Sequence, residues 1–269
     1  MDPQKTRRHT GGKNDVAAIS SGIRRKISKA LIEHGMIEKG SRIIVGLSGG
    51  KDSLLLLTAL SELRHHGNMD FDLAAVTVDI NGQGVGFETL TEYCHNIGVR
   101  HELITYPILD IIREKEERSP CSLCSNLRNG ILFGYAAEKA YDTVALGHNL
   151  DDVVETVIMN LFLAGRFRCF APRSWRSRKK IWAIRPMVYV SEKAITDEAS
   201  RLGLPVTASP CPWGETTKRQ EMKELLRSLE PRFPALKSQI LHALINVKRS
   251  DVWGFDDDSP ESPINAPSA

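Results

Sequence analysis

Apolar and polar positions alternate along this chain in blocks whose spacing predicts strands and helices in turn. Apolar runs rich in β-branched residues are typical of buried strands, and they occur at Ile43–Val45, Asp72–Asp79, His101–Tyr106 and Thr143–Gly147. Apolar residues at helical spacing occur at Ile23–Met36, Asp52–His66, Glu88–Ile97, Ile108–Glu117, Ser122–Ala140, Glu192–Leu202, Glu215–Leu229 and Ala235–Val247. Strands that alternate with helices predict an α/β fold, with a parallel sheet and helices on both of its faces.

The same pattern predicts the domain organisation. Residues 21–190 are expected to form the α/β domain, and residues 191–253, where the pattern is only helical, a helical C-terminal region. Residues 1–20 are rich in Gly, Arg and Lys, and residues 254–269 are acidic and rich in Pro and Ser. These two ends are therefore expected to be a disordered basic arm and a disordered acidic tail.

The composition is that of a globular protein without a membrane anchor. Of the 269 residues 41% are hydrophobic and 26% are charged, and a net charge of +3 is too small to identify a nucleic-acid partner. The chain shows no long uncharged apolar run and no apolar core of a secretory signal, so a cytoplasmic protein is expected. Five cysteines in such a chain argue against a disulfide scaffold and make clustered cysteines candidates for metal binding or catalysis.

The first motif follows the first predicted strand and has the sequence SGGKDS, residues 48–53. A strand that breaks at Gly and Ser and resumes as a helix brings backbone N–H groups and a positive helix dipole to one point. Gly49 and Gly50 leave room for a phosphate, and Lys51 adds a positive charge. The motif is not a Walker A loop, because Asp52 follows the lysine. It predicts a phosphate site, with an ordinary glycine turn as the alternative.

A second motif, LGHNLDDVVET at residues 146–156, also lies at a predicted strand-to-helix junction. Ligands of parallel sheets bind beyond the carboxyl ends of the strands, so His148, Asp151 and Asp152 are expected in the same crevice as the phosphate loop. Paired carboxylates beside a triphosphate suit magnesium, which prefers oxygen ligands. The alternative is that both acids only complement the helix dipole. Asp79, which ends another strand, is a further candidate for the nucleotide pocket.

The third motif is the CxxC pair Cys121 and Cys124, with Cys211 far downstream in SPCPW. Two thiols at the start of a helix have lowered pKa values and can share one metal. Spacing alone leaves four interpretations open, namely buried structural thiols, a redox pair, structural zinc and an iron–sulfur cluster. Three cysteines suit a cubane cluster with one iron left open. Cys94 and Cys169 are expected to be packing or loop thiols.

Residues 166–180, RFRCFAPRSWRSRKK, contain seven basic residues, no acid and three interleaved aromatic residues. Basic side chains neutralise phosphates and aromatic rings stack on unpaired bases, so this basic segment is a candidate RNA-binding surface. Arg24, Arg25 and Lys26 on the first predicted helix are expected to extend it. A solvated basic loop is the alternative.

The motifs resemble those of a known family. SGGKDS resembles the signature of the PP-loop ATP pyrophosphatase superfamily, whose members cleave ATP between the α and β phosphates to adenylate a carbonyl oxygen. The order SGGKDS, CSLCSNLRNGIL, LGHNLDD, IRPM and a late cysteine followed by KRQ resembles the tRNA 2-thiocytidine synthetase family (TtcA), from about Ile23 to Trp253.

The resemblance implies an ATP-dependent enzyme that adenylates C2 of cytidine 32 in the tRNA anticodon loop and replaces its oxygen with sulfur. It implies a [4Fe-4S] cluster held by Cys121, Cys124 and Cys211, with Lys51 and Asp52 as further catalytic residues. The expected site for ATP and Mg²⁺ comprises Ser48, Gly49, Gly50, Lys51, Asp52, Ser53, Asp79, Gly147, His148, Asp151 and Asp152. The expected partners are tRNA, cysteine desulfurase or another sulfur donor, and a second copy of the chain in a homodimer.

Two other functions remain as alternatives. A PP-loop ligase that acts on another base or on a small molecule, with zinc on the cysteines, would contain zinc and lack specific tRNA binding. A catalytically silent nucleotide- or RNA-binding module would show no tRNA-dependent conversion of ATP to AMP.

Overall fold

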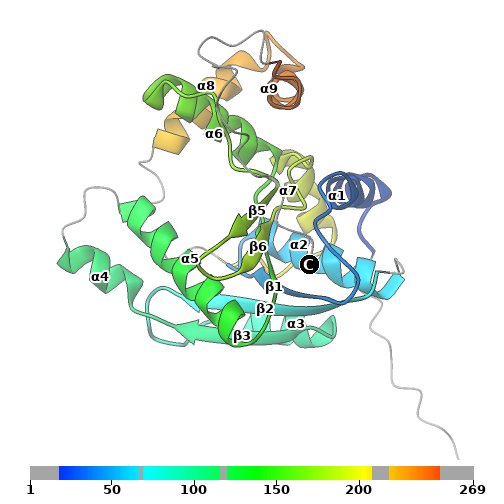
Figure 1. The fold of residues 1–269 in the computed structure, drawn as a ribbon, viewed down its shortest axis with the longest axis vertical. Coiled ribbons are helices and arrows are strands. Elements are labelled where there is room, and N and C mark those ends of the chain that lie inside the picture. Colours follow the sequence, from blue (N-terminus) through cyan, green and yellow to red (C-terminus); the bar gives the residue numbers. More distant parts are fainter. Residues whose placement is uncertain (1–17, 67–68, 116–119, 208–217, 249–269) are drawn as a thin grey trace, which may run out of the picture.

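A six-stranded sheet forms the centre of the molecule (Figure 1). The computed structural model describes residues 18–66, 69–115, 120–207 and 218–248. The strands are β1 (Ser41–Gly46), β2 (Phe71–Asp79), β3 (Arg100–Thr105), β4 (Thr143–Ala145), β5 (Arg173–Arg176) and β6 (Ile181–Ile184). Their order is β3-β2-β1-β4-β6-β5, and all neighbours are parallel except β5, which is antiparallel to β6. The predicted α/β fold is confirmed.

The helices expected from apolar spacing are present. They are α1 (Ser21–Glu33), α2 (Lys51–His66), α3 (Glu88–Asn96), α4 (Ile108–Glu114), α5 (Pro120–Glu138), α6 (Leu150–Ala164), α7 (Glu192–Arg201), α8 (Lys218–Leu229) and α9 (Leu236–Ile245). The predictions differ from the structure mainly at the ends of elements. The strand expected to reach Gly147 ends at Ala145, and the long helix expected from Ser122 begins at Pro120, since proline needs no hydrogen-bond acceptor in a first helical turn.

Sequence patterning did not predict β5 and β6. The first lies inside the basic segment, where arginines obscure the alternation, and the second has only four residues. Both segments form strands because they pair with neighbours in the sheet. Ala183 of β6 lies opposite Val144 of β4 and opposite Ser174 of β5. Part of the basic segment, the candidate RNA-binding surface, is therefore an edge strand.

Both faces of the sheet are covered, as expected for a parallel sheet. Side chains alternate along β1, so Ile43 and Val45 join the core formed with α1, α2 and α7, whereas Ile44 joins the core formed with α5. Figure 1 shows α1 and α2 on one side of the sheet and α5 on the other. All three β1 residues are fully buried.

The sheet order reverses beside β1, and this reversal positions the two sequence motifs. The chain passes from β1 through α2 to β2 on one side, whereas β4 pairs with β1 on the other side, with Val45 opposite Ala145. The loops that follow β1 and β4 therefore lie next to each other at the carboxyl edge of the sheet. Gly147 permits this approach, because a Cβ there would lie 3.2 Å from the carbonyl carbon of Asp52 and from the nitrogen of Ser53.

The C-terminal helices divide between two surfaces. Helix α7 packs against α2, whereas α8 and α9 pack against α6, at the end of the molecule away from β3 (Figure 1). The division at residue 190 and the two disordered ends stay predictions, and residues 1–17 and 249–269 lie outside the described residues. Within the described part of the chain, no helix combines the length and apolar character that crossing a bilayer requires.

Candidate active site

A cavity of about 500 Å³ opens at the carboxyl edge of β1 and β4. Four segments line this central cavity: the end of β1 with the phosphate loop and the start of α2, part of β2, the loop from β4 to α6, and the N-terminal part of α5. Their polar lining residues include Ser48, Asp52, Ser53, Gly147, His148, Asp152, Cys121, Cys124 and Arg128. Residues of the predicted phosphate site, of the predicted carboxylate site and of the CxxC pair thus line one cavity. The CxxC pair is separated from both motifs in the sequence.

The phosphate loop is held in shape by its own hydroxyl groups. Ser53 Oγ accepts a hydrogen bond from the backbone nitrogen of Ser48 at 3.1 Å and lies 3.0 Å from the carbonyl oxygen of Gly50. Gly49 has a φ of 80°, which favours glycine, and a Cβ there would collide with Thr207 Oγ1. The backbone nitrogen of Thr207 donates to the carbonyl oxygen of Gly49 at 3.0 Å. The segment before residue 208 is therefore attached to the phosphate loop.

Lys51 lies beside the central cavity and is held there by two carboxylates. Its Nζ is 3.0 Å from Asp52 Oδ2 and 3.2 Å from Glu192 Oε1. Burial alone lowers the pKa of Lys51, but Asp52 and Glu192 together raise it above its usual value, so the amine is fully charged. Gly49, Gly50 and Lys51 are not among the residues that line the cavity.

Asn149 joins the two predicted motifs. Its Nδ2 donates to Asp52 Oδ1 at 2.8 Å, and its Oδ1 accepts hydrogen bonds from the backbone nitrogens of Asp151 and Asp152. Asp152 Oδ2 accepts in return from the nitrogen of Asn149 at 3.0 Å, which completes a capping box. Sequence reasoning missed Asn149, although an Asn three residues before an Asp at a strand-to-helix junction is a capping signal.

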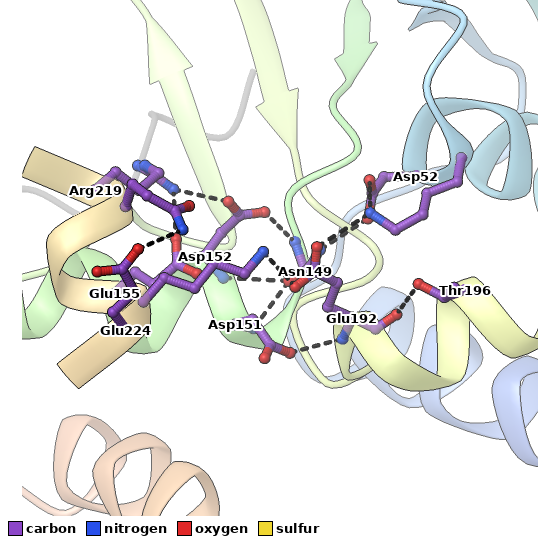
Figure 2. Close-up of polar contacts among 12 residues, drawn as sticks. Asp52, Asn149, Asp151, Asp152, Glu155, Glu192, Thr196, Arg219 and Glu224 are labelled. Atoms are coloured by element: carbon purple, nitrogen blue, oxygen red, sulfur yellow. Dashed lines mark hydrogen bonds and ion pairs between the residues drawn. The ribbon is translucent and has the colours of Figure 1, made fainter. Parts of the chain in front are cut away.

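The two aspartates of the second motif point to different surroundings (Figure 2). Asp152 lines the central cavity with Asp52, and burial raises its pKa while the Asn149 backbone and Arg219 lower it. Asp151 instead accepts from the backbone nitrogen of Glu192 at 2.6 Å and pairs with Lys237 Nζ at 2.6 Å. The carboxylates that share the cavity are therefore Asp52 and Asp152, whose oxygens suit a magnesium ion.

His148 lines the central cavity with an uncharged ring. Burial, and then Arg185 and Arg219, lower its pKa to about 4, so the imidazole is neutral near pH 7. Its ring packs 4.9 Å from Phe170, and its buried Nδ1 has no hydrogen-bond partner among the described residues. His148 therefore adds an uncharged imidazole ring to the lining of the cavity.

The first two turns of α5 bring Cys121 and Cys124 to the same wall of the central cavity. Arg128 follows at helical spacing and also lines the cavity. Sequence reasoning did not single out Arg128, although its position four residues after Cys124 and seven after Cys121 places all three on one helix face. A guanidinium beside two thiols supplies a positive charge next to any anionic group bound there.

Cys211, which the sequence predicts as the third cluster ligand, lies outside the described residues. Within residues 18–66, 69–115, 120–207 and 218–248, no three His, Cys, Asp or Glu side chains are arranged to hold a metal ion.

The other cysteines have packing roles, as predicted. Cys94 is fully buried in the core, and burial raises its pKa to about 12. Cys169 donates to the carbonyl oxygen of Val153 at 3.6 Å, and burial raises its pKa to about 11. Both thiols stay protonated near pH 7 and neither lines the central cavity.

Asp79 has a turn role in the structure. Its side chain is buried and accepts hydrogen bonds from the backbone nitrogens of Asn81, at 2.9 Å, and Gly84, at 2.7 Å. These bonds shape the glycine-rich loop after β2, as is common for an aspartate in a turn. Asp79 was expected in the nucleotide pocket, but the structure does not bring it to the wall of the central cavity.

The basic segment leaves two aromatic rings exposed and uses others internally. Phe167 and Trp175 are about half exposed. Phe170 packs on His148, and the guanidinium of Arg173 lies 3.9 Å from the ring centre of Trp182. The exposed surface therefore offers two rings among basic side chains, while Phe170 connects the segment to the cavity wall.

Glu155 makes the stability of the fold depend on pH. Burial raises the pKa of Glu155 to about 7 from 4.5, although Arg219 opposes this shift. Between these values the folded protein binds more protons than the unfolded chain, so this residue makes the free energy of unfolding fall as pH rises. We expect Glu155→Gln to flatten the dependence of the melting temperature on pH over that range. Calorimetric melts at several pH values test this, and equal slopes for the two proteins would contradict it.

Comparison with known proteins agrees with this geometry. The model of the PP-loop domain family (ATP_bind_3) matches residues 19–211. The tRNA-cytidine(32) 2-sulfurtransferase of Pelobacter propionicus is 39% identical over 229 residues, which cover 84% of this chain and 85% of that protein. The tRNA-cytidine(32) 2-sulfurtransferase of Geobacter sulfurreducens is 39% identical over 230 residues, which cover 84% of this chain and 90% of that protein.

A solved structure is also similar. The U34-tRNA thiolase NcsA from Methanococcus maripaludis, solved with its [4Fe-4S] cluster, superimposes with a TM-score of 0.69 and 26% sequence identity. The match covers 84% of this chain and 79% of that one. The chain therefore belongs to the PP-loop domain family and, within it, to the family of the tRNA-cytidine(32) 2-sulfurtransferases.

Proposed function

We propose that this protein is an ATP-dependent tRNA sulfurtransferase that replaces the C2 oxygen of cytidine 32 in the anticodon loop with sulfur. The observation that carries the proposal is the shared cavity, in which Cys121 and Cys124 face the phosphate loop and Asp152. Activation of an oxygen by ATP and its replacement by sulfur can then occur on one bound base. The names of the relatives, and the [4Fe-4S] cluster of the thiolase from Methanococcus maripaludis, support this assignment.

The phosphate loop and the two cavity carboxylates would bind ATP with magnesium. The N-terminus of α2 presents backbone N–H groups and a positive dipole to the phosphates. Asp52 and Asp152 would hold Mg²⁺ against the phosphate oxygens, and the ion neutralises charge that develops on the leaving pyrophosphate. Lys51 is charged and next to Asp52, and it would add to this stabilisation.

The first chemical step would be adenylation of the base. The C2 oxygen attacks the α phosphorus of ATP, an O–P bond forms, and pyrophosphate leaves. This step turns a poor leaving group into AMP. The neutral ring of His148 would contact an uncharged part of the base or nucleotide, and Arg128 would offer positive charge to the adenylate phosphate.

Cys121, Cys124 and Cys211 would hold a [4Fe-4S] cluster, and the donor set fits such a group because thiolates are its usual ligands. When bound, the cluster would supply an iron that holds a sulfide sulfur close to C2. Cys121 and Cys124 line the cavity that the phosphate loop also lines, so a sulfur delivered there would reach the adenylated base. A C–S bond then forms as the C–O bond breaks, and AMP leaves.

The basic segment would bind the tRNA. Its basic residues suit phosphates, and exposed Phe167 and Trp175 suit bases that have left their stack. The anticodon loop provides such unpaired bases next to a duplex stem. A cysteine desulfurase or another sulfur donor, and a homodimer, stay predictions.

Mass spectrometry of nucleosides tests this function. Protein reconstituted anaerobically with iron and sulfide is incubated with ATP, Mg²⁺, sulfide and a tRNA transcript that carries C32, and a transcript with U32 is the control. We expect 2-thiocytidine from the first transcript, in an amount equal to the AMP formed, and no thiolated nucleoside at position 32 of the second. Iron-loaded protein that binds ATP but leaves the C32 transcript unmodified would overturn the proposal.

A further inference from the structure

Glu192, the first residue of α7, lies between two lysines from distant parts of the chain. Its Oε1 is 3.2 Å from Nζ of Lys51 in the phosphate loop, and its Oε2 is 2.6 Å from Nζ of Lys223 in α8. Burial raises the pKa of Glu192, but Lys223 and Lys51 together lower it below its usual value, so the carboxylate is charged near pH 7. One carboxylate thus joins the phosphate loop to the C-terminal helices.

Asp151 fixes the backbone at Glu192. The backbone nitrogen of Glu192 lies in the first turn of α7, where such nitrogens have no partner within the helix. Asp151 Oδ2 accepts from this nitrogen at 2.6 Å, and Asp151 Oδ1 pairs with Lys237 Nζ of α9 at 2.6 Å. Figure 2 shows Asp151 beside Glu192 at the start of α7. The first aspartate of the second motif therefore holds Glu192.

The element that presents Glu192 to the phosphate loop is itself fixed. Helix α7 packs against α2, whose first residue is Lys51. Val190, just before α7, is fully buried in the same core, and its carbonyl oxygen accepts from the backbone nitrogen of Leu150 at 2.9 Å. The Glu192 carboxylate therefore has a defined position relative to the start of α2.

Lys51 needs such a partner when metal is bound. In the described part of the chain it has two carboxylate partners, Asp52 and Glu192. Under the proposed function Asp52 holds Mg²⁺, which leaves Glu192 to fix the ammonium. Lysine has a long, flexible side chain, so a fixed partner reduces the entropy lost when the ammonium meets a phosphate. Protein kinases use an ion pair between a lysine and a glutamate for this purpose.

We propose that Glu192 is a positioning residue that holds the ammonium of Lys51 toward the phosphates of bound ATP, and that Asp151 keeps Glu192 in place. The proposal rests on the proposed function and deepens it. Asp151, which the sequence motif places in the metal site, then acts on the nucleotide through two other side chains. The helices α8 and α9 contribute Lys223 and Lys237, which compensate the charges of the two acids.

The test combines a double-mutant cycle with a conservative rescue. Glu192→Gln is made in the wild type and in Lys51→Met, because a residue that acts only through Lys51 has no further effect once Lys51 is absent. Asp151→Ala leaves the Glu192 nitrogen without its acceptor, whereas Asp151→Asn keeps an oxygen for it. Asp197→Asn is the matched control, since Asp197 pairs with Lys193 on the exposed face of the same helix.

The readout is the Kd for α,β-methylene ATP with Mg²⁺, measured by calorimetry well below the melting temperature of each variant. We expect Glu192→Gln to weaken binding about tenfold, the effect of losing one charge-assisted hydrogen bond. In the Lys51→Met background it should cause no further weakening. Asp151→Ala should weaken binding in the same direction, Asp151→Asn should recover most of the loss, and Asp197→Asn should match the wild type.

The sign of the effect separates positioning from simple electrostatics. Loss of a negative charge near the phosphate loop would by itself tighten ATP binding, so unchanged or tighter binding by Glu192→Gln would overturn the proposal. Equal weakening with and without Lys51 would also overturn it, because it would show a general structural role. These Kd values need neither tRNA nor iron, so an absence of 2-thiocytidine contradicts the proposed function alone. A wild-type protein that binds no nucleotide would overturn both.

Discussion

Replacing Cys121 by alanine is expected to abolish sulfur transfer while ATP binding stays intact. Cys121 lies in the first turn of α5 and lines the wall of the central cavity with Cys124, whereas the phosphate loop belongs to other segments. Loss of a residue that only supports a metal ligand costs about 10- to 100-fold, so loss of a ligand should reduce 2-thiocytidine formation by more than about 100-fold. Iron content, the visible absorption band and the nucleoside product are measured on the same preparation. The same result is expected for Cys124→Ala.

Cys169→Ala is the matched control for this substitution. Its thiol is half-buried, stays protonated near pH 7 and lies outside the wall of the central cavity. This variant should keep its iron and its activity. A Cys121→Ala protein that retains iron and forms 2-thiocytidine would show that the CxxC pair is not the cluster site, and zinc in the wild-type protein would favour a structural role for it.

Replacing Asp52 by asparagine is expected to abolish magnesium-dependent cleavage of ATP. Among the described residues, Asp52 and Asp152 are the two carboxylates that line the central cavity, and Asp52 Oδ1 accepts a hydrogen bond from Asn149 Nδ2. Asparagine keeps the shape and an oxygen for that hydrogen bond, but removes the negative charge that holds Mg²⁺. Removal of one preorganised electrostatic contact costs about 10²–10³ in rate, and we expect a loss of this size in the formation of AMP at saturating ATP and tRNA.

Without metal, Asp52→Asn is expected to have the opposite effect, on the affinity for ATP. This contrast makes the prediction specific to a metal site. In the presence of EDTA the Asp52 carboxylate only repels the triphosphate, so Asp52→Asn should bind ATP as tightly as the wild type or more tightly. Asp197→Asn is the control, because Asp197 pairs with Lys193 on the surface of α7. Equal rates of AMP formation in Asp52→Asn and wild type, across a titration of Mg²⁺, would contradict the assignment of Asp52 to the metal site.

The local elements of the nucleotide site are predictable from sequence because they depend on short-range physics. A buried strand, a glycine with positive φ and a helix start follow one another at Ile43–Val45, Gly49 and Lys51, and each is specified by its own residue types. Strand alternation likewise predicts the parallel sheet. These features predict that the loops after β1 and β4 share one crevice, since parallel strands end at the same edge.

The roles of the individual aspartates could not be read from the sequence. Asp151 and Asp152 are neighbours on one helix, and a helical pattern does not show which of two adjacent acids faces a cavity that other segments complete. The interaction partners determine which acid faces the cavity. Asp151 pairs with Lys237 and accepts from the Glu192 backbone, whereas Asp152 interacts with Asn149 and Arg219. Asp79 shows the same limit, because its strand-end position is compatible with a pocket or with a turn.

The sequence alone therefore determined the phosphate loop, the α/β order of elements and the cysteine pair at a helix start. Only the tertiary structure decided that α5 turns Cys121, Cys124 and Arg128 toward the phosphate loop, and that α8 and α9 close their ion pairs onto α6. Residue spacing determines which side chains share a face of one element. The order of strands in the sheet and the packing of helices far apart in the chain determine what that face meets.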